Sequence, residues 1–441
     1  MKCGTSATSA DRPLHGAALA PLLSVRRRIG RRGMMDRRTL LAAAAAMPVA
    51  PALAADDERW AGIAAQYDVT RKVAQLEHGN WGMMARPVHA AYRAHVDRVN
   101  RDTSFFARRE MPGEIEAVRA RVAAAMGVGT GEIAFTRNAT EAMRALILGY
   151  NRLRPGDAVL HADLDYDAMQ ACMESLKGRR GAEVIKIALP LPATRQAVID
   201  AYAQAFAAHP NLRMVLLTHV SHRTGLVLPV AEIAAMARLR GIDAIVDAAH
   251  GVGQIDYRLP DLAADFIGIN LHKWIGAPLG VGAIVIRDGR LTDIDIDPAE
   301  AGANPADIRS RVHTGTVDYA ALLAVPAALD FHEGIGAAAK QARLRALRDR
   351  WVRPARALAN VEVLTPDDPG SYGAITAFRL KGRTSHEANV ALARRLLDEH
   401  GIFTVHRDGL ASGSCVRVTP ALATTMEEVD RFVAALRKVA S

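Results

Sequence analysis

The feature that most constrains the fold of this chain is a regular alternation of short apolar runs with amphipathic segments between residues 114 and 287. The runs are apolar on both faces, whereas the segments between them repeat apolar residues at a helical period. Runs of this kind are typical of strands that helices cover on both sides. The alternation therefore predicts an α/β fold with a mainly parallel sheet.

The expected elements follow one another in strict order. Strands are predicted at residues 132–136, 158–162, 182–189, 213–219, 244–249, 265–270 and 281–287. Helices are predicted at residues 114–126, 137–150, 166–177, 195–207 and 230–240. Ligands of such sheets bind beyond the carboxyl ends of the strands, and most of the polar residues considered below fall there.

A second, smaller α/β part is expected after a helix at 319–333. The elements predicted for it are helices at 337–358, 385–400 and 426–438 and strands at 375–380, 403–405 and 415–419. A chain of 441 residues, half of them hydrophobic, is long enough for two domains. We predict a large domain over residues 106–333, a small domain over 334–441, and an N-terminal segment over 55–105.

The formal net charge of +9 is concentrated at the N-terminus. Residues 1–54 carry nine basic and two acidic residues, and the remaining 47 basic and 45 acidic residues leave a charge of only +2. A nearly neutral body gives no reason to expect a polyanionic partner. We therefore predict that the protein binds no nucleic acid.

The basic N-terminus has the features of an export signal. Arg37 and Arg38 form a twin arginine, an apolar stretch follows, and small residues stand at Ala52 and Ala54. The stretch is too short for a membrane span. Its similarity to twin-arginine signals implies that residues 1–54 are a leader and that the folded protein is exported to the periplasm, free of the membrane. The alternative is an ordinary alanine-rich N-terminus, which would leave the protein in the cytoplasm.

Cysteine usage gives little information about the fold. Cys3 lies in the predicted leader, which leaves Cys172 and Cys415 in the remaining chain. Two cysteines form no disulfide framework, although a single bridge is left open.

Lys273 has an unusual setting in the stretch NLHKWIGAPLGVG, residues 270–282. It follows an apolar run and lies between His272 and Trp274, in a chain with eight lysines among its 56 basic residues. Burial lowers the pKa of a lysine and favours the neutral amine, which is the form that makes Schiff bases. The alternative is a lysine that extends to the surface, so the interpretation depends on the residues around it.

Asp247 ends a predicted buried strand. A carboxylate in that position needs a cationic or hydrogen-bonding partner, and the protonated nitrogen of a pyridine ring is one. The alternative is a cap of the local turn. Asn138, Ala139 and Thr140 begin a predicted helix, where free N–H groups and the helix dipole favour a phosphate, although an ordinary N-cap has the same signature.

Tyr166 follows a third strand, where its ring could lie flat on a heterocycle or pack in the ordinary way. A phosphate-binding helix, an aromatic ring, an aspartate and a lysine thus follow in this order on successive strand ends. Their order indicates one site rather than four unrelated residues.

The stretches DAAHGVGQID (247–256) and INLHKWIGAPLGVG (269–282) resemble the class V family of fold-type I pyridoxal-phosphate enzymes. This family includes isopenicillin N epimerases, cysteine desulfurases and kynureninases, and the chain looks most like the epimerase group over about residues 75–440. The resemblance implies a large domain with a mainly parallel seven-stranded sheet, a smaller α/β C-terminal domain, and pyridoxal 5′-phosphate (PLP) as the cofactor.

The resemblance also implies a role for each candidate residue around the cofactor ring. Lys273 would form the Schiff base, Asp247 would pair with the ring nitrogen, and Tyr166 would stack on the ring. His250 would lie near the phenolic oxygen of the cofactor. His222 would also lie there, at a position where many relatives have asparagine.

Further residues are implied for the phosphate and the substrate. The phosphate would be held by residues of three segments: Ala139, Thr140, Asn270 and His272. Thr316 in HTGTVD would reach it from the neighbouring subunit, so a homodimer is implied. Arg417 in CVRVTP matches the arginine that binds the substrate carboxylate, to which a guanidinium fork is well suited. An edge-strand surface arginine is the alternative.

Two departures from the family pattern bear on the reaction. TPALATT, residues 419–425, lacks the aromatic–asparagine pair that is common after the carboxylate-binding arginine. Desulfurases need a mobile nucleophilic cysteine, whereas Cys415 alternates with Arg417 in an apolar strand and is expected to be a packed thiol. Desulfuration is therefore disfavoured.

We expect a PLP enzyme that acts at the α-carbon of an amino acid or an amino-acid-derived substrate, with Lys273 moving the α-proton. Epimerisation needs a proton carrier on each face, and His222 is the candidate for the second; transamination needs only the lysine and an acceptor acid. A lyase or an oxidative reaction on an exported peptide, such as a siderophore precursor, is a further hypothesis. A hypothesis of a different class is that the chain is a non-catalytic binding protein that retains the fold.

Overall fold

The computed structural model describes residues 49–441, with side chains from Asp57 onward. The chain divides into two compact units, residues 1–55 and 56–441, and the description below concerns the second. The predicted leader, with Arg37 and Arg38, lies outside the described residues apart from the start of helix α2 (Val49–Ala64). Export stays a prediction.

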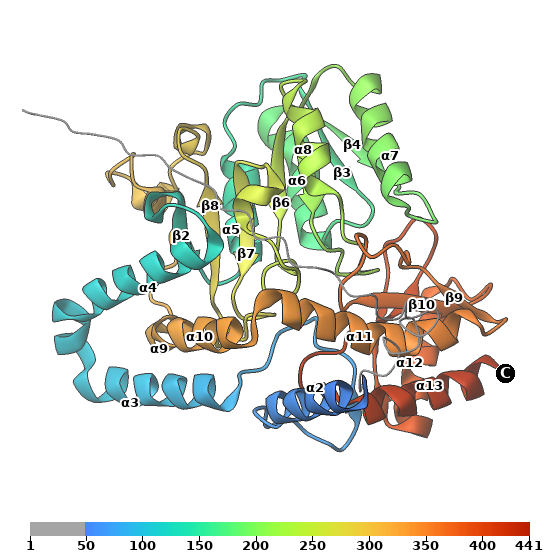
Figure 1. Ribbon diagram of the computed structural model, residues 1–441. Helices are drawn as coiled ribbons and strands as arrows, with labels where there is room; N and C mark the ends of the chain where they lie inside the picture. The colour runs from blue at the N-terminus through green and yellow to red at the C-terminus, as the bar shows by residue number, and fades with distance from the viewer. Residues whose placement is uncertain (1–48) are drawn as a thin grey trace, which may run out of the picture. The chain divides into compact units, whose positions relative to one another are not determined.

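A seven-stranded sheet forms the centre of the large part of the fold (Figure 1), in the order β2-β8-β7-β6-β5-β3-β4. Its strands are β2 (Ile133–Thr136), β3 (Ala158–Ala162), β4 (Glu183–Ile187), β5 (Leu212–Thr218), β6 (Asp243–Asp247), β7 (Phe266–Asn270) and β8 (Gly282–Ile286). The β4–β3, β3–β5, β5–β6 and β6–β7 pairs are parallel, and β8 is antiparallel to both its neighbours. The predicted mainly parallel sheet is confirmed.

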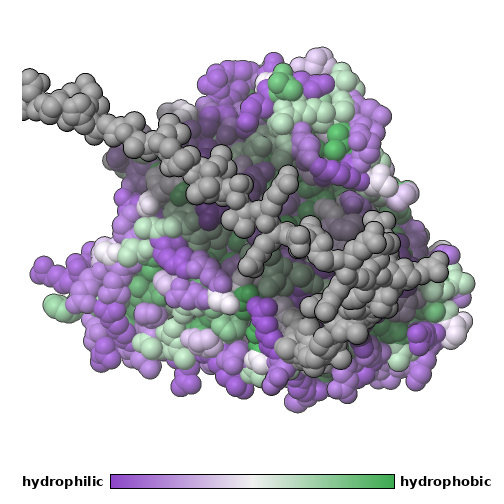
Figure 2. Space-filling model, viewed as in Figure 1, coloured by the Kyte–Doolittle hydropathy of each residue, from purple (hydrophilic) through white to green (hydrophobic). Residues whose placement is uncertain are grey.

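Helices cover both faces of this sheet, as apolar runs on both sides of the strands require. One face packs against α5 (Ala139–Gly149) and α6 (Asp167–Arg180). The opposite face packs against α4 (Met111–Met126), α7 (Arg195–Ala208) and α8 (Val230–Arg238). Figure 2 shows a mainly hydrophilic surface in that view, with small apolar patches, because most large apolar side chains lie in these two cores.

Two helical features differ from the prediction. The sequence interpretation named no helix at α3 (Arg86–Arg109), which packs against α4 and against α9 (Tyr319–Leu323) and α10 (Val325–Ile335). The single helix predicted at 319–333 is divided into α9 and α10 at Ala324. Pro326 stands at the start of α10, where a missing amide N–H is tolerated.

The C-terminal part contains an antiparallel sheet in the order β12-β13-β10-β9. Its strands are β9 (Val361–Val363), β10 (Thr376–Leu380), β12 (Val405–Arg407) and β13 (Cys415–Val418). The helices beside it are α11 (Ala337–Arg356), α12 (His386–His400) and α13 (Met426–Ala440), and the rings of Trp351, Phe378 and Phe432 meet in the core between them. The predicted domain boundaries stay a prediction.

The strand predicted at 403–405 is divided between two sheets. Its first part is β11 (Ile402–Phe403), which pairs in parallel with the short strand β1 (Ala74–Gln75). The pairing attaches the N-terminal segment to the C-terminal part, and a further parallel bridge joins Glu77 to Thr419. Among the described helices, none combines the length and apolar character needed to cross a membrane.

Candidate active site

A cavity of about 320 Å³ lies beyond the carboxyl ends of the parallel strands. Thr218, Asp247 and Asn270 line it from the ends of β5, β6 and β7, as expected for a ligand site of this fold. Ten of the residues predicted from the sequence line this cavity together: Ala139, Thr140, Tyr166, His222, Asp247, His250, Asn270, His272, Lys273 and Arg417. Thr316, predicted to act in the neighbouring subunit, is exposed before α9 and does not line it.

Lys273 occupies a buried turn just after β7. Burial lowers the pKa of its amine from 10.5 to about 8, even though the nearby Asp247 carboxylate raises it. A substantial fraction of this amine is therefore neutral near physiological pH, which a solvated lysine is not. The neutral fraction is the form that attacks a carbonyl or accepts a proton.

His250 connects Lys273 to Trp274. The indole Nε1 of Trp274 is 3.3 Å from Nδ1 of His250, and Nε2 of His250 is 2.9 Å from Nζ of Lys273. Because an indole N–H can only donate, Nδ1 must accept, and a neutral His250 then carries its proton on Nε2. Burial lowers the pKa of His250 well below its usual value, so the ring is neutral and donates to the neutral lysine amine.

Asp247 is buried at the end of β6. Its Oδ1 accepts the N–H of Ala249 at 2.9 Å, and burial raises the pKa of the carboxyl against the opposing effects of that hydrogen bond and of Lys273. The carboxyl and the lysine amine line the same cavity, as the interpretation of one shared ligand requires. A ring nitrogen that carries a proton would supply the cationic partner that this carboxylate lacks.

The start of α5 is organised by two asparagines. Asn138 accepts the N–H of Glu141 at 2.9 Å as the N-cap, and Asn270 accepts the N–H of Ala139 at 2.8 Å. These bonds leave the N–H and hydroxyl of Thr140 for an anion at the positive end of the helix. Asn270 therefore holds the N–H of Ala139, and the predicted contacts of both residues with the phosphate stay a prediction.

Tyr166 and His222 lie side by side at the cavity. Their rings meet edge to face with centroids 5.1 Å apart, and Tyr166 is 38% exposed, which leaves a ring face open to a ligand. Burial lowers the pKa of His222 to about 4, and its Nδ1 is buried without a hydrogen-bond partner. His222 thus presents a neutral imidazole to the cavity.

Arg417 already has partners at all three guanidinium nitrogens. Its Nε and Nη2 donate to the two carboxylate oxygens of Glu77, and its Nη1 donates to the carbonyl of His222 at 2.6 Å. Arg407 also lines the cavity; its Nη2 is 3.5 Å from Glu77, and its Nε is buried without a partner. Arg407, Arg417 and Glu77 therefore form a cluster of two arginines and one carboxylate, with a net positive charge.

The segment Glu77–Gly82 is the main part of the site that the sequence interpretation missed. A Cβ at Gly79 would lie 2.6 Å from Nη2 of Arg417, and one at Gly82 would lie 1.8 Å from the carbonyl oxygen of Lys273. Gly82 requires glycine because a backbone atom approaches so closely, whereas at Gly79 the guanidinium of Arg417 would have to move. The signal in the sequence was the pair of glycines in EHGNWG, which follows a short apolar run.

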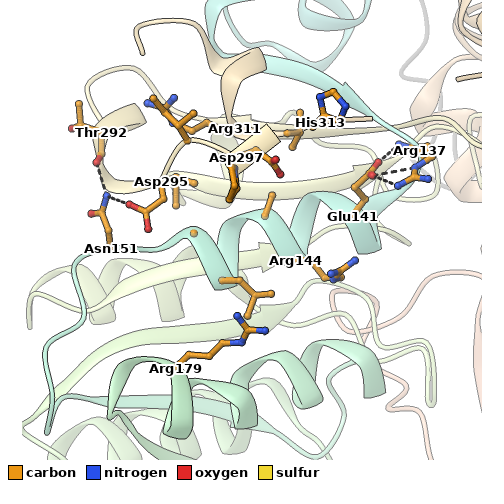
Figure 3. Close-up of a pocket in the computed structure, with 17 residues that line it drawn as sticks. Arg137, Glu141, Arg144, Asn151, Arg179, Thr292, Asp295, Asp297, Arg311 and His313 are labelled. Atoms are coloured by element: carbon orange, nitrogen blue, oxygen red, sulfur yellow. Dashed lines mark hydrogen bonds and ion pairs between the residues drawn. The ribbon is translucent and has the colours of Figure 1, made fainter. Parts of the chain in front are cut away.

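A larger cavity of about 880 Å³ lies beside α5 (Figure 3). Arg137 lines both cavities and pairs with Glu141 in the larger one. The walls of the larger cavity are strongly charged, and its described lining residues include no lysine. It therefore lacks the amine that Schiff-base chemistry needs, and the smaller cavity is the candidate active site.

The sequence profile of the family described as Aminotransferase class-V matches residues 86–432. The chain belongs to the class V aminotransferase family. It is 32% identical to isopenicillin N epimerase of Streptomyces clavuligerus over 82% of this chain and 94% of that protein. It is also 30% identical to putative L-cysteine desulfhydrase 2 of Oryza sativa subsp. japonica, over 59% of this chain and 58% of that protein.

Solved structures support the fold of this class V chain. A C-DES variant with glycine covalently linked to its PLP cofactor aligns with a TM-score of 0.71 at 22% identity, over 84% of this chain and 98% of that one. The predicted fold type I is confirmed, and the predicted cofactor is confirmed for the family. The exact reaction differs among the relatives.

The residues of this class V site fit PLP. The cavity has the volume of a small-molecule site. It brings together a lysine amine with a lowered pKa, a buried carboxylate for the ring nitrogen, an aromatic ring with an open face and a helix start for the phosphate. Asp247, Lys273 and Thr140 would make the principal contacts with the cofactor.

The two cysteines in the described part of this class V chain are not placed for desulfuration. Cys415 is fully buried, and burial raises the pKa of its thiol to about 12, so the predicted packed thiol is confirmed. Cys172 is partly buried on α6, and neither lines the candidate active site. Both thiols are free, which resolves the disulfide alternative.

Proposed function

We propose that this protein is an amino-acid epimerase of the class V family, which moves the proton at the α-carbon of an amino acid or an amino-acid-derived substrate. The observation that carries the proposal is the buried amine of Lys273, which has a pKa of about 8 and shares one cavity with Asp247. The similarity to isopenicillin N epimerase over most of both chains supports the same conclusion.

PLP, when bound, supplies an electron sink that stabilises negative charge at the α-carbon of the substrate. The carboxylate of Asp247 holds a positive charge at the ring nitrogen position. The Nε2–H of His250 orients the neutral amine of Lys273 through the 2.9 Å contact, and the amine takes the α-proton once its single lone pair has left that contact. His250 is buried and Lys273 is partly buried, which limits the access of bulk water to that proton.

His222 is the proposed second proton carrier. It lines the cavity as a neutral imidazole whose Nδ1 is without a protein partner. Its Nε2 is 3.7 Å from Asp167, which would stabilise the ring when it holds an extra proton. Epimerisation requires such a second group, whereas transamination does not.

Arg407 and Arg417 are proposed to receive the substrate carboxylate. Glu77 neutralises one of the two positive charges, so one anionic group restores the balance of the cluster. A single carboxylate on the substrate, as in an ordinary amino acid, therefore matches the site. Arg407 is the more available of the two because its side chain is 25% exposed, against 1% for Arg417, whose three nitrogens all have partners.

A second candidate function is elimination from a sulfur-containing amino acid. The similarity to a plant L-cysteine desulfhydrase favours it, and α-proton removal by Lys273 would be its first step as well. The reaction needs no protein thiol, so the burial of Cys415 does not exclude it.

The test uses the PLP-loaded enzyme in deuterated water with a panel of L- and D-amino acids. Epimerisation predicts α-deuterium in the product together with inversion on a chiral column; elimination predicts ammonia, a keto acid and, from cysteine, sulfide. Transfer to an added keto acid would show transamination. Retention of the α-proton in every substrate would overturn the proposal.

Two variants serve as matched controls for that test. Lys273→Ala should abolish exchange and the cofactor absorbance that borohydride bleaches. Lys340→Met should keep both. Lys340 is also a buried lysine with a pKa lowered to about 7, but it hydrogen-bonds the Trp274 carbonyl outside the candidate active site.

We propose two further properties that extend beyond one chain. The twin arginine at Arg37 and Arg38 supports export to the periplasm, and fractionation with N-terminal sequencing of the mature protein tests it. Thr316, exposed before α9, supports a homodimer in which this residue reaches the partner's phosphate site. Light scattering, with PLP affinity of Thr316→Val, tests that arrangement.

A further inference from the structure

Three potential metal ligands meet on the surface of the C-terminal part, beside Arg407 but not among the residues that line the candidate active site. His386, His406 and Asp408 each offer one ligand atom, and these atoms lie within 4.8 Å of one another. The two imidazole rings meet edge to face with centroids 5.0 Å apart. We propose that these three side chains bind a divalent transition-metal ion of the zinc class.

Two of the three distances between the ligand atoms are close to the distances between ligand atoms around a zinc ion. Oδ2 of Asp408 is 3.0 Å from Nδ1 of His386 and 3.6 Å from Nε2 of His406. Tetrahedral zinc with bond lengths of about 2.0–2.1 Å separates its ligand atoms by roughly 3.3–3.4 Å. Shifts of a few tenths of an ångström therefore bring these two distances to the spacing around one ion. The nitrogens of the two imidazoles lie within 4.8 Å of each other, and a larger movement of the exposed His386 ring would complete the set, with a fourth position for water.

The ligand types select among metals. Two imidazoles and one carboxylate suit zinc, copper or nickel, whereas magnesium and calcium prefer oxygen ligands alone. The side chains of His386, His406 and Asp408 are 55%, 35% and 45% exposed, so an ion can enter from solvent without unfolding.

Neighbouring residues orient the carboxylate. The hydroxyl of Ser414 donates to Oδ1 of Asp408 at 2.6 Å and leaves Oδ2 directed at the two histidines. The N–H of Ser414 in turn donates to the carbonyl of Thr384 at 2.8 Å, which joins this loop to the start of α12. Outer hydrogen bonds of this kind fix metal ligands in their binding orientation.

The backbone positions of both histidines are also fixed. His386 is the first residue of α12, whose N-cap Ser385 accepts the N–H of Ala388. His406 is in the middle of β12 and pairs with Val416 of β13. An ion bound here would join the first turn of α12 to β12, two elements that carry no covalent link at this point.

The candidate metal site lies next in the chain to Arg407, one of the two arginines proposed to bind the substrate carboxylate. His406 and Asp408 flank Arg407, and the side chain of Arg407 lines the candidate active site from the neighbouring strand position. A metal on the two flanking residues would fix the backbone that carries Arg407. This coupling, unlike the metal site itself, rests on the proposed function.

Calorimetric titration of the chelator-treated, PLP-loaded full chain with zinc chloride tests the site without substrate. We expect one zinc ion per chain. His386→Gln and His406→Gln should each weaken this binding by at least about tenfold, and Ser414→Ala by a smaller factor. His386 and His406 are at least partly exposed, whereas Ser414 is buried, and circular dichroism with the cofactor absorbance would confirm that the variants fold.

His313→Gln is the matched control. His313 also contacts a carboxylate, Glu300, at 2.6 Å, but it belongs to no group of three potential ligands among the described residues. Its replacement should leave the zinc affinity unchanged. Absence of saturable binding to the wild type, or a zinc affinity in both histidine variants equal to that of the wild type, would overturn the proposal.

The coupling to Arg407 is measured separately by steady-state kinetics. Zinc should change the KM of the wild type with little change in kcat, and it should have no effect on His406→Gln. If no amino acid is turned over, the proposed function fails while the calorimetric result stands. If turnover occurs and zinc leaves KM unchanged, the coupling is wrong.

Discussion

Both carboxylate oxygens of Glu77 accept hydrogen bonds from the guanidinium of Arg417, and the two side chains are only 7% and 1% exposed. A buried charge is costly unless it has a partner of opposite sign. The arginine that the family resemblance assigns to substrate binding is therefore also held by a structural ion pair. Because Arg417 would have both roles, the predictions below distinguish effects on stability from effects on catalysis.

Replacement of Glu77 should destabilise the protein strongly. Glu77→Ala leaves the buried guanidinium of Arg417 without its carboxylate, so we expect the free energy of unfolding to fall by about 3–5 kcal/mol. Chemical denaturation of the apoprotein measures this change. Asp430→Ala removes the exposed partner of Arg350 and should cost less than about 1 kcal/mol. Equal losses in the two variants would contradict the prediction.

Arg407 and Arg417 should respond differently to substitution. Arg407→Gln removes the more exposed of the two guanidinium groups, so we expect KM for the amino acid to rise by about 10- to 100-fold, the equivalent of a lost charged hydrogen bond of about 1.5–3 kcal/mol, with little loss of stability. Arg417→Gln should chiefly lower stability because Glu77 loses its partner. An unchanged KM in a stable Arg407 variant would remove Arg407 from substrate binding.

Covalent attachment of PLP to the apoprotein should accelerate as the pH rises, with a midpoint near 8. Attack on the aldehyde requires the neutral amine of Lys273, whose pKa is lowered to about 8, whereas an ordinary lysine would give a midpoint near 10.5. The initial rate of the absorbance change reports attachment. The carboxylate of Asp247 raises this pKa, so Asp247→Asn should move the midpoint to lower pH; a shift in the opposite direction would contradict the assigned geometry.

A methyl group at Gly82 should disrupt the site through the backbone alone. The Cβ of Gly82→Ala would lie 1.8 Å from the Lys273 carbonyl oxygen, so the turn must shift and PLP affinity should fall by at least about tenfold. Gly113→Ala is the control, because a Cβ there meets nothing within 4 Å and alanine favours the helix by roughly 0.5–1 kcal/mol. Equilibrium dialysis of PLP measures both variants.

The ends of the parallel strands were predictable because their chemistry is local. Asp247 directly ends an apolar run, and Lys273 follows another run within three residues. In a parallel sheet all such ends lie at one edge, so the order of the motifs along the chain sufficed to bring these residues into one cavity. The fold class followed from the same alternation.

Contacts between distant segments were not predictable in the same way. Glu77 and Gly82 lie in a segment with only a two-residue strand, and their partners are near residues 417 and 272. No periodicity marks such a segment. The role of Arg417 was inferred from resemblance, which did not reveal that Glu77 occupies its guanidinium.

The aromatic rings at the cavity show another feature that could not be predicted from the sequence. Tyr166 was placed correctly at a strand end, but its edge-to-face contact with His222 depends on a loop 56 residues further on. Similarly, the strand predicted at 403–405 is shared by two sheets because β1 arrives from the N-terminal segment to pair with its first half. Both features depend on tertiary packing rather than on local pattern.

The segment Glu77–Gly82 is anchored at both ends. Its first residue bridges to Thr419 beside β13, and the N–H of its last residue donates to the carbonyl of His272 at 2.9 Å. We therefore expect a displacement of β13, which bears Arg417, to move the six residues Glu77–Gly82 and, through them, the peptide unit next to Lys273. We therefore expect binding of the substrate carboxylate to Arg407 and Arg417 to affect the orientation of Lys273. A substrate without a carboxylate would then lose reactivity as well as affinity.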